Sequence, residues 1–177
     1  MTHMNDIAWV DAETTGLDPV RHEVIDVWVV LTNTRGEVLD EAGGLVLPRR
    51  IEAATPRALE INCYSEARWA AEARPWAEVW AEVEPLIDGA RISGHKVDFD
   101  IGHLTHQCER EGTAWPPTKL PHICTLEIAR AALPRRSHQL DRLCNHFGIS
   151  NHGAHSARAD AYRALNLWRA LKTFKEE

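Results

Sequence analysis

The segment Ile7-Ala-Trp-Val-Asp11-Ala-Glu13 decides the fold. Its unbroken apolar run is typical of a strand covered on both faces, and the run ends abruptly at Asp11. Because side chains two residues apart leave the same face of a strand, we expect Asp11 and Glu13 to point into one space. Two negative charges there repel unless a cation joins them, and carboxylate oxygens suit Mg²⁺ or Mn²⁺. Taken alone, the pair also fits a surface Asp-x-Glu at a strand end.

The bulk composition fits one globular domain over residues 1–177, with 44% hydrophobic and 26% charged residues. The formal net charge is -6, so no global basic field exists to hold a long nucleic acid, and a polyanionic substrate must be gripped locally. The four cysteines form no Cys-x-x-Cys pair, and no apolar run of membrane length is present. We therefore expect a reduced, cytoplasmic protein without a membrane partner. Residues 1–4 are left out of the fold prediction.

The chain changes its pattern once, from strands alone to strands alternating with helices. Residues 24–32 and 38–47 are predicted strands joined by turn chemistry at 33–36, which extends the first strand into an antiparallel meander. Further along we expect a helix between Pro56 and residue 89, strands at 91–93 and 122–125, and helices at 99–112, 126–133, 139–147 and 157–174. This order indicates an α/β or α+β fold.

A second acidic segment is Gly94-His-Lys-Val-Asp-Phe-Asp100. Asp100 shares a four-residue spacing with Leu104 and Cys108, so it can face inward from the start of a helix. Asp98 is the alternative, and it lies off that row.

The third segment is His155-Ser-Ala-Arg-Ala-Asp160. With Ser156 as N-cap, Asp160 falls in the first turn of the last helix, on the row of its apolar residues. A buried unpaired charge is costly, so a partner such as a metal is expected there. His155 precedes the helix on a loop, where a side chain that titrates near neutral pH can take a proton from water.

Together the three segments resemble the motifs of the DnaQ-like (DEDDh) 3′-5′ exonucleases, in residues 11–19, 94–100 and 155–160. The resemblance implies a ribonuclease H-like fold, with a mixed five-stranded sheet of three antiparallel strands and two βα units flanked by helices. It also implies hydrolysis of single-stranded DNA or RNA 3′ ends to nucleoside 5′-monophosphates with two divalent cations, Mg²⁺ or Mn²⁺. The implied metal ligands are Asp11, Glu13, Asp100 and Asp160.

The same resemblance implies roles for the residues around this ligand set. His155 would be the general base, and Glu13 would also help to orient the attacking water. The implied substrate contacts are Thr14, Thr15, Gly16, Leu17 and His95.

Two basic features of the sequence are candidates for contact with the phosphates of a nucleic acid. Lys96 stands where relatives often have Asn, and it can bring a cation near the nucleic acid backbone. Arg130, Arg135, Arg136 and His138 form a basic stretch that can guide phosphates, although a solvated run of charges is equally compatible.

Other functions remain as alternatives. One is a proofreading exonuclease subunit that acts with a DNA polymerase; because the chain ends one helix after Asp160, we expect a freestanding nuclease instead. A ribonuclease H-type endonuclease shares the carboxylates but not His155. A non-catalytic module that binds nucleic-acid ends would be expected to have lost part of the ligand set, whereas all five positions are filled here.

Overall fold

The structure is a computed structural model that describes residues 5–116, 118–134 and 137–174. Its strands are β1 (Ile7–Thr14), β2 (Val24–Thr32), β3 (Val38–Leu45), β4 (Arg91–Gly94) and β5 (Lys119–Cys124). Its helices are the short 3-10 helix η1 (Ile51–Ala53), α1 (Pro56–Ile61), α2 (Glu66–Glu72), α3 (Trp76–Ile87), α4 (Val97–Glu111), α5 (Thr125–Ala132), α6 (Leu140–His146) and α7 (Ala157–Thr173).

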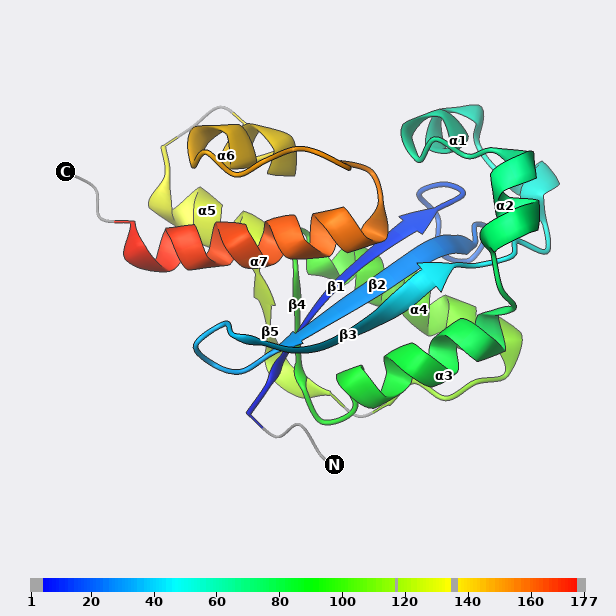
Figure 1. Cartoon of the computed structure of the whole chain (residues 1–177), viewed down its shortest axis with the longest axis horizontal. Helices are drawn as coiled ribbons and strands as arrows, with labels where there is room; N and C mark the ends of the chain where they lie inside the picture. Colours follow the sequence, from blue (N-terminus) through cyan, green and yellow to red (C-terminus); the bar gives the residue numbers. More distant parts are fainter. Residues whose placement is uncertain (1–4, 117, 135–136, 175–177) are drawn as a thin grey trace.

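The five strands form one mixed sheet in the order β3-β2-β1-β4-β5 (Figure 1). The β1–β2 and β2–β3 pairs are antiparallel, and the β1–β4 and β4–β5 pairs are parallel. The predicted ribonuclease H-like arrangement, with three antiparallel strands followed by two βα units, is therefore confirmed.

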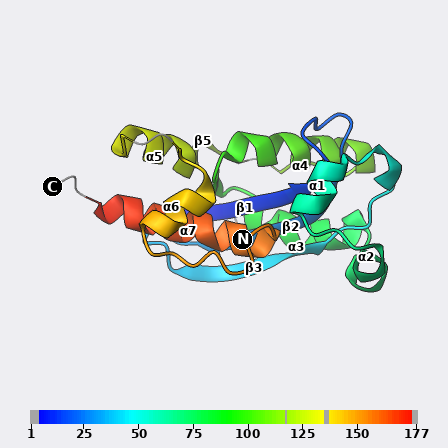
Figure 2. The same ribbon diagram turned by 90° about the horizontal axis from the view of Figure 1, so that it is seen from above.

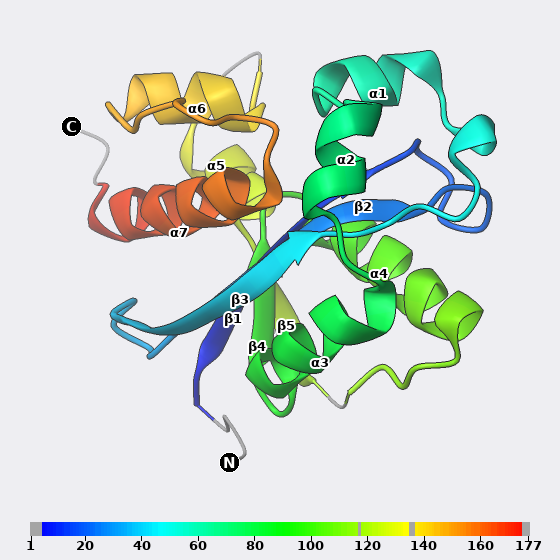
Figure 3. The same ribbon diagram turned by 45° about the vertical axis from the view of Figure 1, so that its right-hand side comes forward.

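Helices cover both faces of this sheet. Seen from above, β1 lies between α4 and α7 (Figure 2). Helix α7 packs on β1 and β2, and α3 and α4 pack on the opposite face, while α5 and α6 lie beside α7 (Figure 3). Among the helices of the described residues, none is both long and apolar enough to cross a membrane.

The alternation of side chains along β1 assigns its two faces. Ala8, Val10 and Ala12 belong to the core beneath α3 and α4, whereas Ile7 and Trp9 pack against α7. By the two-residue period of a strand, Asp11 and Glu13 follow Trp9 onto the α7 face. The strand therefore carries its carboxylates toward the beginning of α7.

The region predicted as helical between Pro56 and residue 89 is divided into α1, α2 and α3. Ser65 caps the N-terminus of α2, where its side chain accepts a hydrogen bond from the backbone N–H of Arg68. Pro75 precedes α3, where its missing N–H is tolerated. The apolar spacing from Trp76 to Leu86 belongs to α3 alone. The boundaries between the three helices are set by the capping residues, which this spacing does not reveal.

Two glycines offer a direct test of the strand packing. A Cβ at Gly43, on β3, would lie 2.1 Å from the backbone oxygen of Val27, whereas a Cβ at Gly102, on α4, meets nothing within 4 Å. We expect Gly43→Ala to destabilise the protein by about 2 to 3 kcal/mol. Gly102→Ala should stabilise it by about 0.5 to 1 kcal/mol, because alanine favours the helix. Urea denaturation measures both, and equal effects would contradict this packing.

Candidate active site

Four acidic side chains from the three motif segments converge near the end of β1. Burial raises the pKa of Asp11 well above its ordinary value, and the negative charges of Asp100, Glu13, Asp160 and Asp26 raise it further. Every one of these influences acts in the same direction. The end of β1 is therefore a place where negative charge is concentrated without full compensation.

Glu13 lies at the centre of a group that can hold a cation. One ligand atom each from Glu13, His155 and Asp160 falls within 4.8 Å of the others. Burial raises the pKa of Glu13 to about 8, with further contributions from Asp160 and Asp26. The carboxylate oxygens of Glu13 and Asp160 are hard ligands, and a divalent cation between them would stabilise their ionised forms.

Asp100 reaches the cluster from the first turn of α4. It is 3% exposed, and its carboxylate accepts a hydrogen bond from the backbone N–H of Ala12 at 3.0 Å. Strands β1 and β4 are paired only as far as Trp9 and Ser93, so Asp100 occupies the place where the strands diverge. Asp98 is exposed. The inward-facing member of the pair is therefore Asp100.

His155 and Asp160 stand on either side of the start of α7. Asp160 is 8% exposed, whereas the side chain of His155 is exposed. The backbone of His155 is left-handed, with φ of 67°, and its N–H donates to Asp160 at 3.3 Å. This conformation ties the histidine backbone to the carboxylate and leaves the imidazole accessible to water.

Asp26, on β2, is an acidic neighbour that the sequence reasoning missed. It is paired with Glu13 across the strands and is 8% exposed. Its carboxylate accepts a hydrogen bond from the N–H of Ala157 at 3.1 Å, and so stabilises the N-terminus of α7. The available signal was one carboxylate in the otherwise apolar run Val24-Ile-Asp-Val-Trp-Val-Val.

Hydrogen bonds of two buried threonine side chains fix the segment from Thr14 to Leu17. The Thr14 hydroxyl donates to the carbonyl of Gly16 at 2.8 Å, and the Thr15 hydroxyl accepts from the backbone N–H of Glu23 at 2.8 Å. Leu17, by contrast, is 80% exposed. The buried threonines thus position a loop that presents an apolar side chain to solvent, and their contact with substrate stays a prediction.

His95 is engaged within the protein through both ring nitrogens. Nε2 lies 3.0 Å from the carbonyl oxygen of His138, so it carries the proton. Burial lowers the pKa of His95 to about 4, so the ring is neutral and Nδ1 accepts from Thr125 at 2.9 Å. His95 also lines the pocket beside the carboxylates, and its predicted role in substrate binding stays open.

That pocket has a volume of about 930 Å³ and a basic rim. His155 and Asp160 line it on the cluster side, and Lys96, Arg130 and Arg142 contribute the cations. Lys96 has a left-handed backbone with φ of 66°, which is uncommon for a lysine. Of the predicted basic stretch, Arg135 and Arg136 lie outside the described residues.

A mixed sheet of this order, flanked by helices, places the chain in the ribonuclease H-like fold class. A family model described as exonuclease, of the RNase T type, matches residues 8–168. The chain therefore belongs to this exonuclease family, and the resemblance to DnaQ-like exonucleases is confirmed.

Similar curated proteins include DNA polymerase III proteins of two kinds. The chain is 33% identical over 165 residues to the PolC-type DNA polymerase III of Lacticaseibacillus paracasei, covering 92% of this chain and 11% of that protein. It is 25% identical over 167 residues to the DNA polymerase III subunit epsilon of Treponema pallidum, covering 91% and 74%. The chain thus spans about a tenth of the length of the PolC-type relatives.

Solved structures share the fold. Exonuclease I of E. coli, in complex with a dT13 oligonucleotide, superimposes with a TM-score of 0.82 at 21% identity, over 96% of this chain and 41% of that chain. A zinc-bound form of the same enzyme matches with a TM-score of 0.81 at 20% identity, over 97% and 41%. Dependence on divalent metal is a general property of this exonuclease family.

The raised pKa of Glu13 predicts how the metal-free protein responds to pH. Folding favours the neutral carboxyl group, so its stabilisation is full below the ordinary pKa of 4.5 and is lost as pH rises through about 8. Glu13→Gln stays neutral, so in EDTA it should match the wild type near pH 5 and unfold several degrees higher, roughly 3 to 6 °C, at pH 8.5.

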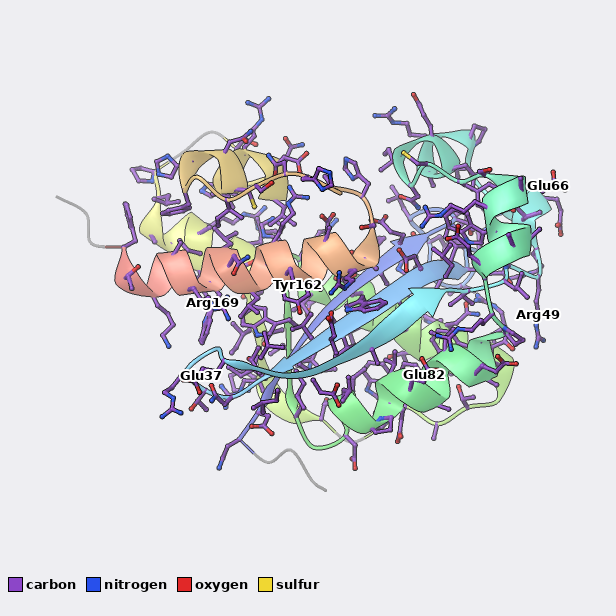
Figure 4. All side chains as sticks on the ribbon, in the orientation of Figure 1. Glu37, Arg49, Glu66, Glu82, Tyr162 and Arg169 are labelled. Carbon is purple, nitrogen blue, oxygen red and sulfur yellow. The ribbon has the colours of Figure 1, made fainter. Side chains whose placement is uncertain are left out.

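Differential scanning calorimetry at both pH values measures this difference. The matched control is Glu66→Gln, at an exposed position on α2 that Figure 4 labels, and it should leave the pH dependence unchanged. Parallel curves for wild type and Glu13→Gln would contradict the prediction. With Mg²⁺ at about 100 times its dissociation constant, the wild type should gain roughly 5 to 10 °C and the variant less.

Proposed function

We propose that this chain is a 3′-5′ exonuclease that removes nucleotides from single-stranded DNA or RNA ends and releases nucleoside 5′-monophosphates. The observation that carries the proposal is the convergence of Asp11, Glu13, Asp100 and Asp160 beside His155. Membership of the exonuclease family supports it. Residues 1–177 form one exonuclease domain in this proposal.

The four carboxylates are the proposed ligands of two divalent cations, Mg²⁺ or Mn²⁺. Their donor set consists of hard oxygens, and burial raises the pKa of all four carboxyl groups, with neighbouring carboxylates raising it further for Asp11, Glu13 and Asp100. A bound cation would stabilise their ionised forms. When bound, such cations supply a readily deprotonated water and stabilise the charge that develops on the leaving 3′ oxygen.

The protein groups complete the chemistry. His155 accepts the proton of the attacking water through its exposed imidazole, which lies beside Glu13 and Asp160. Glu13 accepts a hydrogen bond from that water and so orients it. Leu17 contacts the terminal nucleotide from the loop that Thr14 and Thr15 hold in place.

A second candidate is proofreading beside a DNA polymerase. The named relatives favour it, because they are DNA polymerase III proteins or subunits. A proofreading enzyme should remove a mismatched 3′ nucleotide from a primed template faster than a matched one. A freestanding single-strand exonuclease should degrade unpaired ends fastest.

The decisive assay uses 3′-labelled and 5′-labelled DNA and RNA oligonucleotides with Mg²⁺ or Mn²⁺. The wild type should shorten them from the 3′ end and release nucleoside 5′-monophosphates. We expect Asp11→Ala and Asp100→Ala to reduce the rate at least about 10³-fold, and His155→Ala about 10²- to 10⁴-fold.

Asp98→Ala is the matched control, because Asp98 is exposed and lies in the first turn of the same helix as Asp100. Its rate should stay within about twofold of wild type. Internal cuts would indicate an endonuclease, and binding without cleavage would indicate an end-binding module. Activity that survives both Asp11→Ala and His155→Ala would exclude the proposed mechanism.

Lys96 makes a separate prediction about binding. Its exposed ammonium lies close enough to Asp100 to influence that carboxyl group, so it can meet a phosphate entering the site. In a His155→Ala background, Lys96→Asn should reduce the slope of log affinity against log salt by about 0.7, as expected for one lost phosphate contact to a single strand. Fluorescence anisotropy with a labelled oligonucleotide, at fixed Mg²⁺ and varied KCl, measures the slope. Identical slopes would place Lys96 outside the phosphate path.

A further inference from the structure

Arg163 is a buried cation inside the candidate active site. It lies on α7, three residues after Asp160, and is 3% exposed. Nearby inward positions of the same helix, including Ala164 and Leu167, are apolar. Because a buried guanidinium is costly without partners, its contacts reveal what it holds.

The Arg163 guanidinium joins three parts of the structure. Nη1 donates to Oδ1 of Asp160, and Nη2 donates to Oδ1 of Asp141 on α6 and to Oδ1 of Asn151 in the loop between α6 and α7. Asn151 is itself fixed, since its amide donates to the carbonyl of Asp141 at 3.2 Å and to Asn145 at 2.8 Å. One side chain thus connects α6, the loop and α7.

These contacts fix the carboxylate of Asp160 from two sides. Oδ1 accepts from Arg163, and Oδ2 accepts from the backbone N–H of His155. Asp160 and Asp141 both line the pocket beside the cluster. The orientation of Asp160 is therefore coupled to the α6 wall of the pocket and to the loop that carries His155.

We propose that Arg163 is a positioning residue that fixes Asp160 for binding of a divalent cation and ties the carboxylate cluster to α6. This inference rests on the proposed function of the cluster as a metal site. A positioning role and a purely electrostatic role of Arg163 predict opposite changes in cation affinity when Arg163 is replaced. Removal of a neighbouring positive charge alone would strengthen cation binding, whereas loss of positioning weakens it.

The test measures Mn²⁺ binding by isothermal titration calorimetry, without substrate. We expect Arg163→Leu to weaken binding about 10- to 100-fold, the range for residues that orient metal ligands. Arg163→Lys keeps the charge but loses the planar fork, so it should also weaken binding. Asp141→Asn removes the ion pair at the α6 end and also a negative charge beside the pocket, so electrostatics alone would weaken binding in this variant, and Arg163→Lys decides the role of positioning.

Arg169→Leu is the matched control on the same helix. Figure 4 shows Arg169 toward the far end of α7, where it donates to Asn166 and to the carbonyl of Gly36. This variant should bind Mn²⁺ like the wild type. With an oligonucleotide substrate, Arg163→Lys should lower kcat more than it changes KM, because Asp160 is a proposed ligand of the cations that would stabilise the transition state.

The outcomes separate the two levels of the proposal. If the wild type binds no divalent cation, the metal site of the proposed function fails. If the wild type binds Mn²⁺ and Arg163→Lys binds it equally well or more tightly, Arg163 has only a structural or electrostatic role. Should Arg163→Leu fail to fold, Arg163→Lys, which keeps the charge, still decides between these results.

Discussion

Repulsion among carboxylates at the end of β1 is the constraint on which the rest of the site depends. The protein compensates part of this charge: Ala12 donates to Asp100, Ala157 donates to Asp26, and Arg163 pairs with Asp160. Asp11 and Glu13 differ, because burial and neighbouring carboxylates only raise their pKa values. The uncompensated charge therefore lies on β1, where a cation would have the largest electrostatic effect.

The topology places this charge where an opening in the sheet is available. The pairing of β1 with β4 ends at Trp9. Beyond that point the backbone N–H of Ala12 donates a hydrogen bond to the carboxylate of Asp100 instead of to a strand. On the other face, β1 directs its carboxylates toward the N-terminus of α7, whose dipole favours negative charge. The point where the parallel strands β1 and β4 diverge therefore lies beside the N-terminus of α7. Ligand sites of α/β sheets commonly lie where strands diverge in this way.

Local periodicity explains why much of this arrangement was predictable from the sequence. The two-residue period of a strand placed Asp11 and Glu13 together, and the four-residue row of a helix favoured Asp100 over the exposed Asp98. Asp26 was missed because its pairing with Glu13 depends on strand register. Arg163 was missed because its burial depends on Asp141 and Asn151, which belong to other segments. Contacts of this kind come from tertiary structure, and a periodic pattern carries no signal for them.

Both missed residues act on α7, and this shows how the site depends on groups outside its motifs. Asp26 holds the first N–H of the helix, and Arg163 holds the carboxylate one turn later. Because α7 carries Asp160 and follows directly after His155, any movement of its N-terminus would displace both relative to Glu13 on the sheet. The carboxylate cluster is consequently assembled by two buried ionic groups of opposite charge, one on β2 and one within α7 itself, which fix the helix against the sheet and against α6.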